Sequence, residues 1–120
     1  MRSSKMWLST TGPADLVGTR YFEVMATGTT LCLCNRMADP AVYSSLGIRE
    51  GVHVAMFDTL AEFEELAINF TKPEHEARRM AIVRRAQLLA FRKFSWHHVG
   101  ERVEGALRAA AKSGNAVAAR

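Results

Sequence analysis

Cysteine, proline and long apolar runs are scarce in this 120-residue sequence, and each scarcity excludes a class of protein. The two cysteines, Cys32 and Cys34, are separated by one residue. A strand would place both on one face, where they are a poor pair for a structural disulfide. No histidine pair joins them at the spacing of a zinc site. We therefore expect two small, buried thiols in a reduced, cytoplasmic protein without a bound metal.

Membrane segments and the common nucleotide and catalytic motifs are also missing. No segment approaches the ~18 consecutive apolar residues that a membrane-spanning helix needs, and the amino-terminal residues lack the apolar stretch of a secretion signal. The GxGxxG, P-loop, Ser-His-Asp and CxxC patterns are absent. With 48% hydrophobic and 23% charged residues, the composition is that of a globular domain. We expect no membrane span and no cofactor.

The net charge of +4 is unevenly distributed along the chain. Residues 1–71 carry five basic and eight acidic side chains, whereas residues 72–120 carry eleven basic and four acidic ones. A basic carboxy-terminal half is typical of proteins that bind nucleic acid or another acidic partner. The basic residues are not interleaved with aromatic side chains that would stack on bases. We therefore favour a solvated helical face over nucleic-acid binding, and keep an acidic partner as an alternative.

The order of apolar residues and turn formers predicts strands that alternate with helices. Residues 29–34 (TTLCLC) are uncharged and mostly apolar or β-branched, which is typical of a strand buried on both faces of a parallel sheet. Gly28 follows a helical pattern and suits the position that ends a helix. The expected order is a strand at 5–9, a helix at 19–27, a strand at 29–34, an irregular segment at 35–51, a strand at 52–57, and then helices only.

This alternation favours an α/β fold. A doubly wound sheet has about five or six strands, and only three are visible here. The sequence therefore predicts the second half of a Rossmann-like doubly wound parallel sheet, with C-terminal helices. We assign residues 1–112 to a partial domain, and residues 113–120, most of which are small, to a flexible tail.

The first helix after the last strand has a clear start. Thr59 and Glu62 fit a capping box, in which each side chain bonds a free backbone N–H of the first turn. Apolar residues then recur at helical spacing, which predicts that one face packs on the sheet. They are Phe63, Leu66, Ala67 and Phe70.

A second capping box, Thr71 to Glu74, predicts a helix that ends near Phe91, followed by a last helix at 96–111. We expect the larger apolar residues of the first of these helices to face the core and its paired arginines to face solvent. The two sets are Met80, Val83, Leu88 and Phe91 on the core side, and Arg78, Arg79, Arg84 and Arg85 on the solvent side.

The best candidate for a ligand-binding site is the junction between the first strand and the first helix. Ligands of open α/β sheets bind where strand ends meet helix amino termini, and a helix amino terminus attracts phosphate. Gly18 would let the backbone approach an anion closely, and Arg20 in the first turn adds donors for phosphate. Glu23 could accept both hydroxyls of a ribose. The alternative for Glu23 is a simple surface ion pair with Arg20, three residues earlier.

The stretch GTRYFEVMATGTTLCLCNR resembles the donor-site segment of glycosyltransferases with the two-domain GT-B fold. It is most similar to the group 1 carboxy-terminal domains, within them to the spore-maturation-protein-like branch. That family has two glutamates with seven residues between them, followed by a hydrophobic-small-x-glycine turn. Asp15, Glu23 and Gly28 match these positions, and Gly18 matches the loop glycine. The resemblance covers about residues 5–110, including the later run KPEHEARRMAIVRRAQLLAFRKFSWHHVGERV.

The resemblance implies a role for each matching residue. Glu23 would hold the ribose of a nucleoside-diphosphate sugar, and Gly18, Thr19 and Arg20 would hold the diphosphate. Asp15 and Arg20 are the implied catalytic residues, although Asp15 is one methylene shorter than the usual glutamate. The family's amino-terminal domain, which brings the acceptor, is expected to be missing, so the chain alone should bind donor poorly and turn over nothing.

Two other functions remain open. The basic helices after residue 72 could form a non-catalytic module that binds an acidic partner. The chain could also be a degenerate transferase that folds but binds nothing. His97 and His98 are adjacent and so point to different sides of a helix, which excludes a metal pair and favours a packing or capping role.

Overall fold

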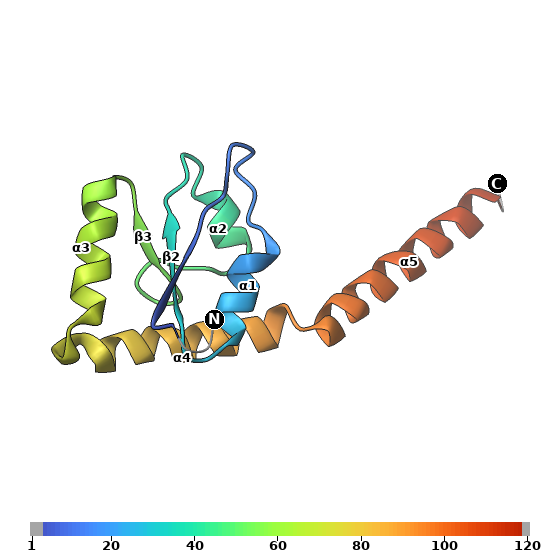
Figure 1. The fold of residues 1–120 in the computed structure, drawn as a ribbon. Coiled ribbons are helices and arrows are strands. Elements are labelled where there is room, and N and C mark those ends of the chain that lie inside the picture. Colours follow the sequence, from blue (N-terminus) through green and yellow to red (C-terminus); the bar gives the residue numbers. More distant parts are fainter. Residues whose placement is uncertain (1–3, 119–120) are drawn as a thin grey trace.

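The computed structural model describes residues 4–118. It has three parallel strands that alternate with helices, followed by a long carboxy-terminal helix (Figure 1). The elements are β1 (Met6–Ser9), α1 (Thr19–Ala26), β2 (Leu31–Asn35), α2 (Ala41–Ser45), β3 (Ala55–Phe57), α3 (Leu60–Thr71), a short 3-10 helix η1 (Pro73–His75), α4 (Glu76–Lys93) and α5 (Trp96–Ala118). The predicted α/β fold class is confirmed.

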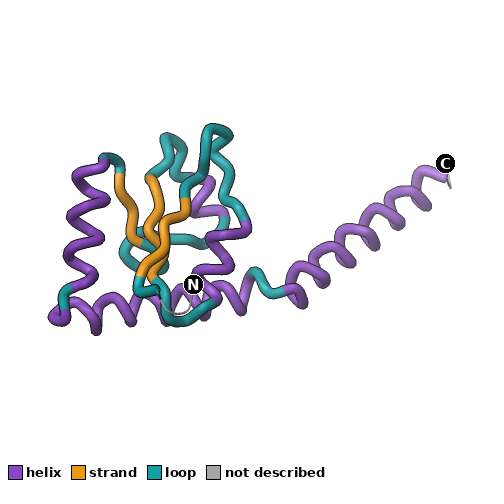
Figure 2. Tube along the Cα trace, in the orientation of Figure 1, coloured by secondary structure: helices purple, strands orange, loops and turns teal. Residues whose placement is uncertain are grey.

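The strands form one sheet in the order β1-β2-β3, with both neighbouring pairs parallel. Leu33 of β2 pairs with Leu8 on one side and with Ala55 on the other. The carboxyl ends of all three strands therefore meet at one edge of the sheet, where loops connect them to the following helices (Figure 2). That edge is where an α/β protein builds a ligand site.

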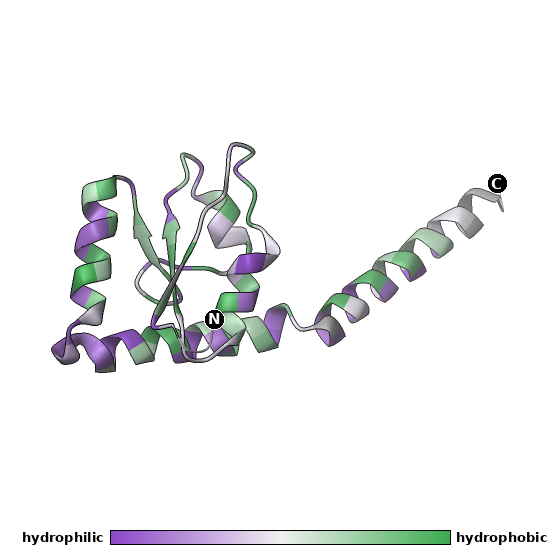
Figure 3. Ribbon diagram, viewed as in Figure 1, coloured by the Kyte–Doolittle hydropathy of each residue, from purple (hydrophilic) through white to green (hydrophobic). Residues whose placement is uncertain are grey.

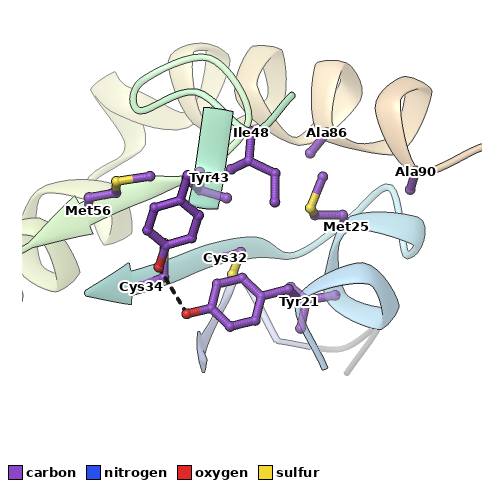
Figure 4. Packing of buried hydrophobic residues seen from close by; sticks show 11 residues of the cluster. Tyr21, Met25, Cys32, Cys34, Tyr43, Ile48, Met56, Ala86 and Ala90 are labelled. Carbon is purple, nitrogen blue, oxygen red and sulfur yellow. Dashed lines mark hydrogen bonds between the residues drawn. The ribbon is translucent and has the colours of Figure 1, made fainter. Parts of the chain in front are cut away.

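The central strand β2 is buried on both faces, as its apolar sequence predicts. Cys32 and Cys34 face α1 and α2, whereas Leu31 and Leu33 face α3. Figure 4 shows the first of these clusters, where the hydroxyls of Tyr21 and Tyr43 lie 3.1 Å apart. Both thiols are free and buried, and the hydrogen bond with Cys32, followed by burial, raises the pKa of Cys34. The predicted core role of the cysteines is confirmed.

The segment predicted as irregular, 35–51, contains the short helix α2, and β3 begins three residues later than predicted. Ala41 N–H donates to Asp39 Oδ1 at 2.9 Å just before α2, whose N-cap residue is Pro40. The backbone N–H groups of Val52 and His53 both donate to the carbonyl of Arg49. This turn occupies the residues that the pattern assigned to the start of β3.

The first predicted cap is confirmed and the second is wrong. Thr59 Oγ1 accepts from Glu62 N–H at 3.2 Å, and Glu62 Oε2 accepts from Asp58 N–H at 2.9 Å. Thr71 instead ends α3, where its hydroxyl donates to the carbonyl of Ile68. The turn η1 begins without a side-chain cap. Phe70 is buried as expected, so the apolar face of α3 does cover the sheet.

Helix α4 runs along the amino-terminal end of the sheet and contacts both core clusters (Figure 1). The predicted inward side is wrong for Leu88 and Phe91, which are 52% and 55% exposed. The predicted outward side is wrong for Arg79, which is 4% exposed. The buried stripe consists mainly of small or β-branched residues that allow close approach to the sheet: Arg79, Ile82, Val83, Ala86 and Ala90.

Arg79 is buried because its guanidinium bonds backbone carbonyls at the amino-terminal end of the sheet. Its guanidinium donates to the carbonyls of Lys5 at 2.9 Å and Thr29 at 2.7 Å, just before β1 and β2 begin. The other side of the guanidinium pairs with Glu76. An arginine here closes the amino-terminal end of the sheet, which explains why the charge is tolerated inside.

The last helix is longer than predicted, since α5 reaches Ala118 rather than residue 111. It leaves the body of the domain and extends as a single helix (Figure 1). Residues 113–118 of the expected tail are helical, and residues 119–120 lie outside the described part of the chain. Among residues 4–118, no helix has both the length and the apolar character to cross a membrane.

Candidate functional site

The carboxyl edge of the sheet is organised by an asparagine at the end of β2. Asn35 Oδ1 accepts from Thr11 N–H at 3.0 Å, and Asn35 Nδ2 donates to Thr11 Oγ1 at 2.9 Å. These two bonds fix the start of the loop that leads from β1 to α1. Sequence reasoning missed Asn35, although a polar residue that ends a buried strand is a signal for this edge.

The loop between β1 and α1 folds back on itself and carries Asp15. The backbone N–H of Asp15 donates to Gly12 O, and that of Leu16 donates to Thr11 O. Asp15 has φ 50°, in the left-handed region that aspartate tolerates better than most residues. Its side chain is exposed. The structure thus places Asp15 near the carboxyl edge, three residues before Gly18, the N-cap residue of α1.

The amino terminus of α1 is open. Gly18 is the N-cap residue in an extended conformation, with no side-chain cap and no acidic residue in the first turn. A side-chain atom added at Gly18 would meet nothing within 4 Å. The start of α1 therefore has no side chain of its own that bonds its first N–H groups, which is what a phosphate site at this position requires.

Arg20 and Glu23 lie together on an exposed face of α1. The distance from Arg20 Nε to Glu23 Oε2 is 3.7 Å, and both side chains are more than half exposed. The guanidinium also lies 5.9 Å from the ring centre of Trp7 on β1. An exposed ion pair of this kind contributes only about 0.3–0.5 kcal/mol. Both partners are therefore free to exchange this contact for a stronger ligand.

A groove lies between α1 and the junction of α4 and α5. It has a volume of about 540 Å³. Thr19 and Glu23 line its polar side, and the rings of Phe22 and Phe94, whose centres are 4.4 Å apart, form part of its apolar side. The structure thus brings Thr19 and Glu23 to this groove, with Arg20 beside Glu23, while Asp15 stays in the preceding loop.

A second charged cluster lies where β2 and β3 end, and sequence reasoning missed it. Arg36 contacts Glu50, and its Nη1 donates to Asp58 and to Glu62, each at 3.0 Å. The bond to Glu50 is the main cause of the raised pKa of Arg36. The backbone N–H of Asp58, followed by Arg36, lowers the pKa of Glu62. Three carboxylates already occupy this guanidinium, so it is a poorer phosphate ligand than Arg20.

The histidines form local contacts. Ser95 Oγ and His98 Nδ1 lie 2.6 Å apart at the start of α5, and His97 Nε2 lies 3.1 Å from Glu101. Burial, with help from two nearby arginines, lowers the pKa of His53. Within residues 4–118, no three His, Cys, Asp or Glu side chains form a group suited to a metal ion.

Comparison with known proteins identifies the family. A family model described as glycosyl transferase-like matches residues 1–105. Neither the search of curated proteins nor the search of solved structures found a significant match. The match covers all three strands and the helices α1 to α4. The chain therefore belongs to the glycosyl transferase-like family.

Proposed function

We propose that this domain binds the diphosphate and ribose of a nucleoside-diphosphate sugar at the amino terminus of α1. The observation that carries the proposal is the open start of α1, with Gly18 at the N-cap and Arg20 in the first turn. Cations are disfavoured at this end of a helix because the helix dipole is positive there. An arginine in that position is best accounted for by an anionic ligand.

The diphosphate would be held by the first N–H groups of α1 and by Arg20. Two negative charges at the helix amino terminus attract the guanidinium more strongly than the single, half-exposed carboxylate of Glu23 does at 3.7 Å. Donor binding would therefore draw Arg20 from Glu23 to the diphosphate. The carboxylate of Glu23 would then be free to accept both ribose hydroxyls.

The chemical contribution of these residues would be electrostatic. When the glycosyl bond to the donor breaks, negative charge develops on the leaving diphosphate, where the α1 N–H groups and Arg20 stabilise it. We propose that Asp15, in the loop before α1, lies beside the donor sugar. A second domain, as in a GT-B architecture, would bind the acceptor.

The test separates the ribose contact from the phosphate contact. The full chain is titrated calorimetrically with UDP, GDP, their 2′-deoxy forms and inorganic pyrophosphate. Replacing Glu23→Ala should weaken binding of the better ribonucleotide about tenfold, as expected for loss of hydrogen bonds to a charged group. The same change should leave pyrophosphate binding unaltered. Arg20→Ala should weaken both, and Glu64→Ala on exposed α3 should weaken neither.

The deoxynucleotide supplies the sharpest comparison. The wild-type chain should prefer the ribonucleotide, whereas Glu23→Ala should bind the two forms equally. A variant that keeps the wild-type preference would show that Glu23 does not contact the ribose. Equal pyrophosphate affinity for wild type and Arg20→Ala would show that Arg20 does not bind the phosphates at the start of α1.

The exposed basic residues of α4 favour a second candidate function, the binding of an acidic partner. Arg84 and Arg92 are exposed on this helix, while Arg85 donates to the carbonyl of Val52 and Arg78 stacks over Phe70. Such binding would fall steeply as salt rises. A fluorescent single-stranded oligonucleotide and heparin, each titrated at two salt concentrations, test it; binding that is absent or independent of salt would eliminate this function.

A further inference from the structure

The outer face of α4 combines large apolar side chains with basic ones. Leu88 and Phe91 are 52% and 55% exposed on this face. Arg84 lies four residues before Leu88 and Arg92 lies four residues after it, so helical spacing places both arginines on the same face, where they are exposed. Figure 3 shows hydrophilic and hydrophobic residues interspersed along α4. The residues that α4 buries in the core belong to its opposite side.

This part of the chain is uniformly basic. Residues 77–100 contain six lysine or arginine side chains and no aspartate or glutamate. They are Arg78, Arg79, Arg84, Arg85, Arg92 and Lys93, of which all but Arg79 are exposed. Within residues 4–118, no ion pair joins Arg84 or Arg92 to a carboxylate. The outer face of α4 therefore offers positive charge that its own chain leaves uncompensated.

The outer face continues at its carboxyl end into a hollow of about 370 Å³ between α4 and α5. The hollow is lined by Arg92, Lys93, His98, Glu101 and Arg102. Three fixed cations thus accompany a single carboxylate, and that carboxylate already lies 3.1 Å from His97 Nε2. The charge of the hollow suits a phosphate group, so it extends the positive surface beyond the end of α4.

The position of α4 leaves its outer face accessible to a broad, flat partner. Helix α4 lies along one end of the domain, with the sheet, α1 and α3 all on the same side of it, and α5 also turns to that side (Figure 1). The carboxyl edge of the sheet, which carries the proposed donor site, lies at the opposite end of the domain. A partner on α4 therefore does not cover the start of α1.

We propose that the outer face of α4 docks this domain on the surface of an anionic lipid bilayer. The arginines would lie among the anionic headgroups, which attract basic residues near the surface. Leu88 and Phe91 would enter the boundary between headgroups and acyl chains, as the apolar residues of interfacial helices do. A nucleic acid would use the charges but leave Leu88 in water. The surface is separate from the donor site and does not depend on donor binding.

Co-sedimentation of the full chain with lipid vesicles tests the proposal. The wild type should bind vesicles that contain phosphatidylglycerol at least about tenfold more tightly than vesicles of phosphatidylcholine alone. Leu88→Ala should weaken binding to the anionic vesicles about threefold or more. Leu60→Ala, the same change at a leucine that is 71% exposed on α3, should leave it unaltered. A wild type without preference for anionic vesicles, or equal effects of the two leucine variants, would overturn the proposal.

Heparin separates a lipid surface from any other polyanion. Because charge governs heparin binding, the double change Arg84→Glu and Arg92→Glu should weaken both heparin and vesicle binding by about tenfold or more. Leu88→Ala should weaken vesicle binding alone. If Leu88→Ala lowers the affinity for heparin as much as that for vesicles, Leu88 does not enter the lipid and the proposal is wrong.

A fluorophore that reports polarity tests which face meets the lipid. The native thiols are buried, so the labelled wild type sets the background. On addition of anionic vesicles, the emission of a label on Leu88→Cys should shift to the blue, whereas that of a label on Leu60→Cys should not. Equal shifts at the two positions, or a shift on Leu60→Cys alone, would contradict docking through α4.

Discussion

Replacement of the buried arginine tests how the domain is held together. Arg79→Met keeps most of the side-chain volume but removes the donors to the carbonyls of Lys5 and Thr29, and leaves Glu76 without its main partner. A hydrogen bond from a charged group contributes about 1.5–3 kcal/mol, and the carbonyl of Lys5 keeps the N–H of Leu31 as a donor. We therefore expect the free energy of unfolding to fall by about 2–4 kcal/mol. This is a large part of the stability of a small domain.

Urea denaturation followed by circular dichroism measures this loss, with Arg84→Met as the matched control on the exposed side of the same helix. The control should change the free energy of unfolding by no more than about 0.5 kcal/mol. Arg79→Lys keeps the charge but loses the guanidinium fork, and should lie between the two; it also gives a measurable value if Arg79→Met does not fold. A loss below about 1 kcal/mol for Arg79→Met would refute the role that we assign to this residue.

Two further predictions follow from neighbouring features. Arg79, followed by Lys5, lowers the pKa of Glu76 to about 2 from its ordinary value of 4.5. The ion pair therefore stabilises the fold above about pH 4.5, and this stabilisation is lost as the pH falls towards 2. Over that window the melting temperature of the wild type should decline, and that of Arg79→Met should decline less. Gly28 ends α1 with φ 67°, and an added methyl group would lie 2.4 Å from the Gln87 side chain, so Gly28→Ala should destabilise by about 1–2 kcal/mol. Gly100→Ala, in open space within α5, should instead be neutral or slightly stabilising; equal melting temperatures for the two glycine variants would contradict this reasoning.

Local sequence signals predicted the elements that depend on local chemistry. The apolar segment that forms β2, the positive φ of Gly28 and the cap between Thr59 and Glu62 all follow from side chains close in sequence. The predicted site residues on α1 also depend on one local event, the start of the helix at Thr19. That start occurs where the sequence indicated.

Features that depend on distant parts of the chain were not predictable in this way. The pattern of α4 suggested that its largest apolar residues face the core. A helix that packs closely across the end of a sheet needs small residues on the side that contacts the sheet. Ala86 and Ala90 are therefore buried, and Leu88 is not. Arg79 is buried because of two carbonyls 74 and 50 residues away. The cluster around Arg36 likewise joins residues that only the parallel pairing of β2 and β3 brings together.

The central claim is that the amino terminus of α1 binds the diphosphate of the donor. The most direct measurement is a titration of the isotopically labelled chain with UDP or GDP, followed by backbone amide chemical shifts. The account predicts that the largest chemical-shift changes occur at the amides of Gly18, Thr19 and Arg20. The ribonucleotide, unlike its 2′-deoxy form, should also shift the amide of Glu23. Largest changes around Arg36 and Asp58, with no change at the start of α1, would contradict it.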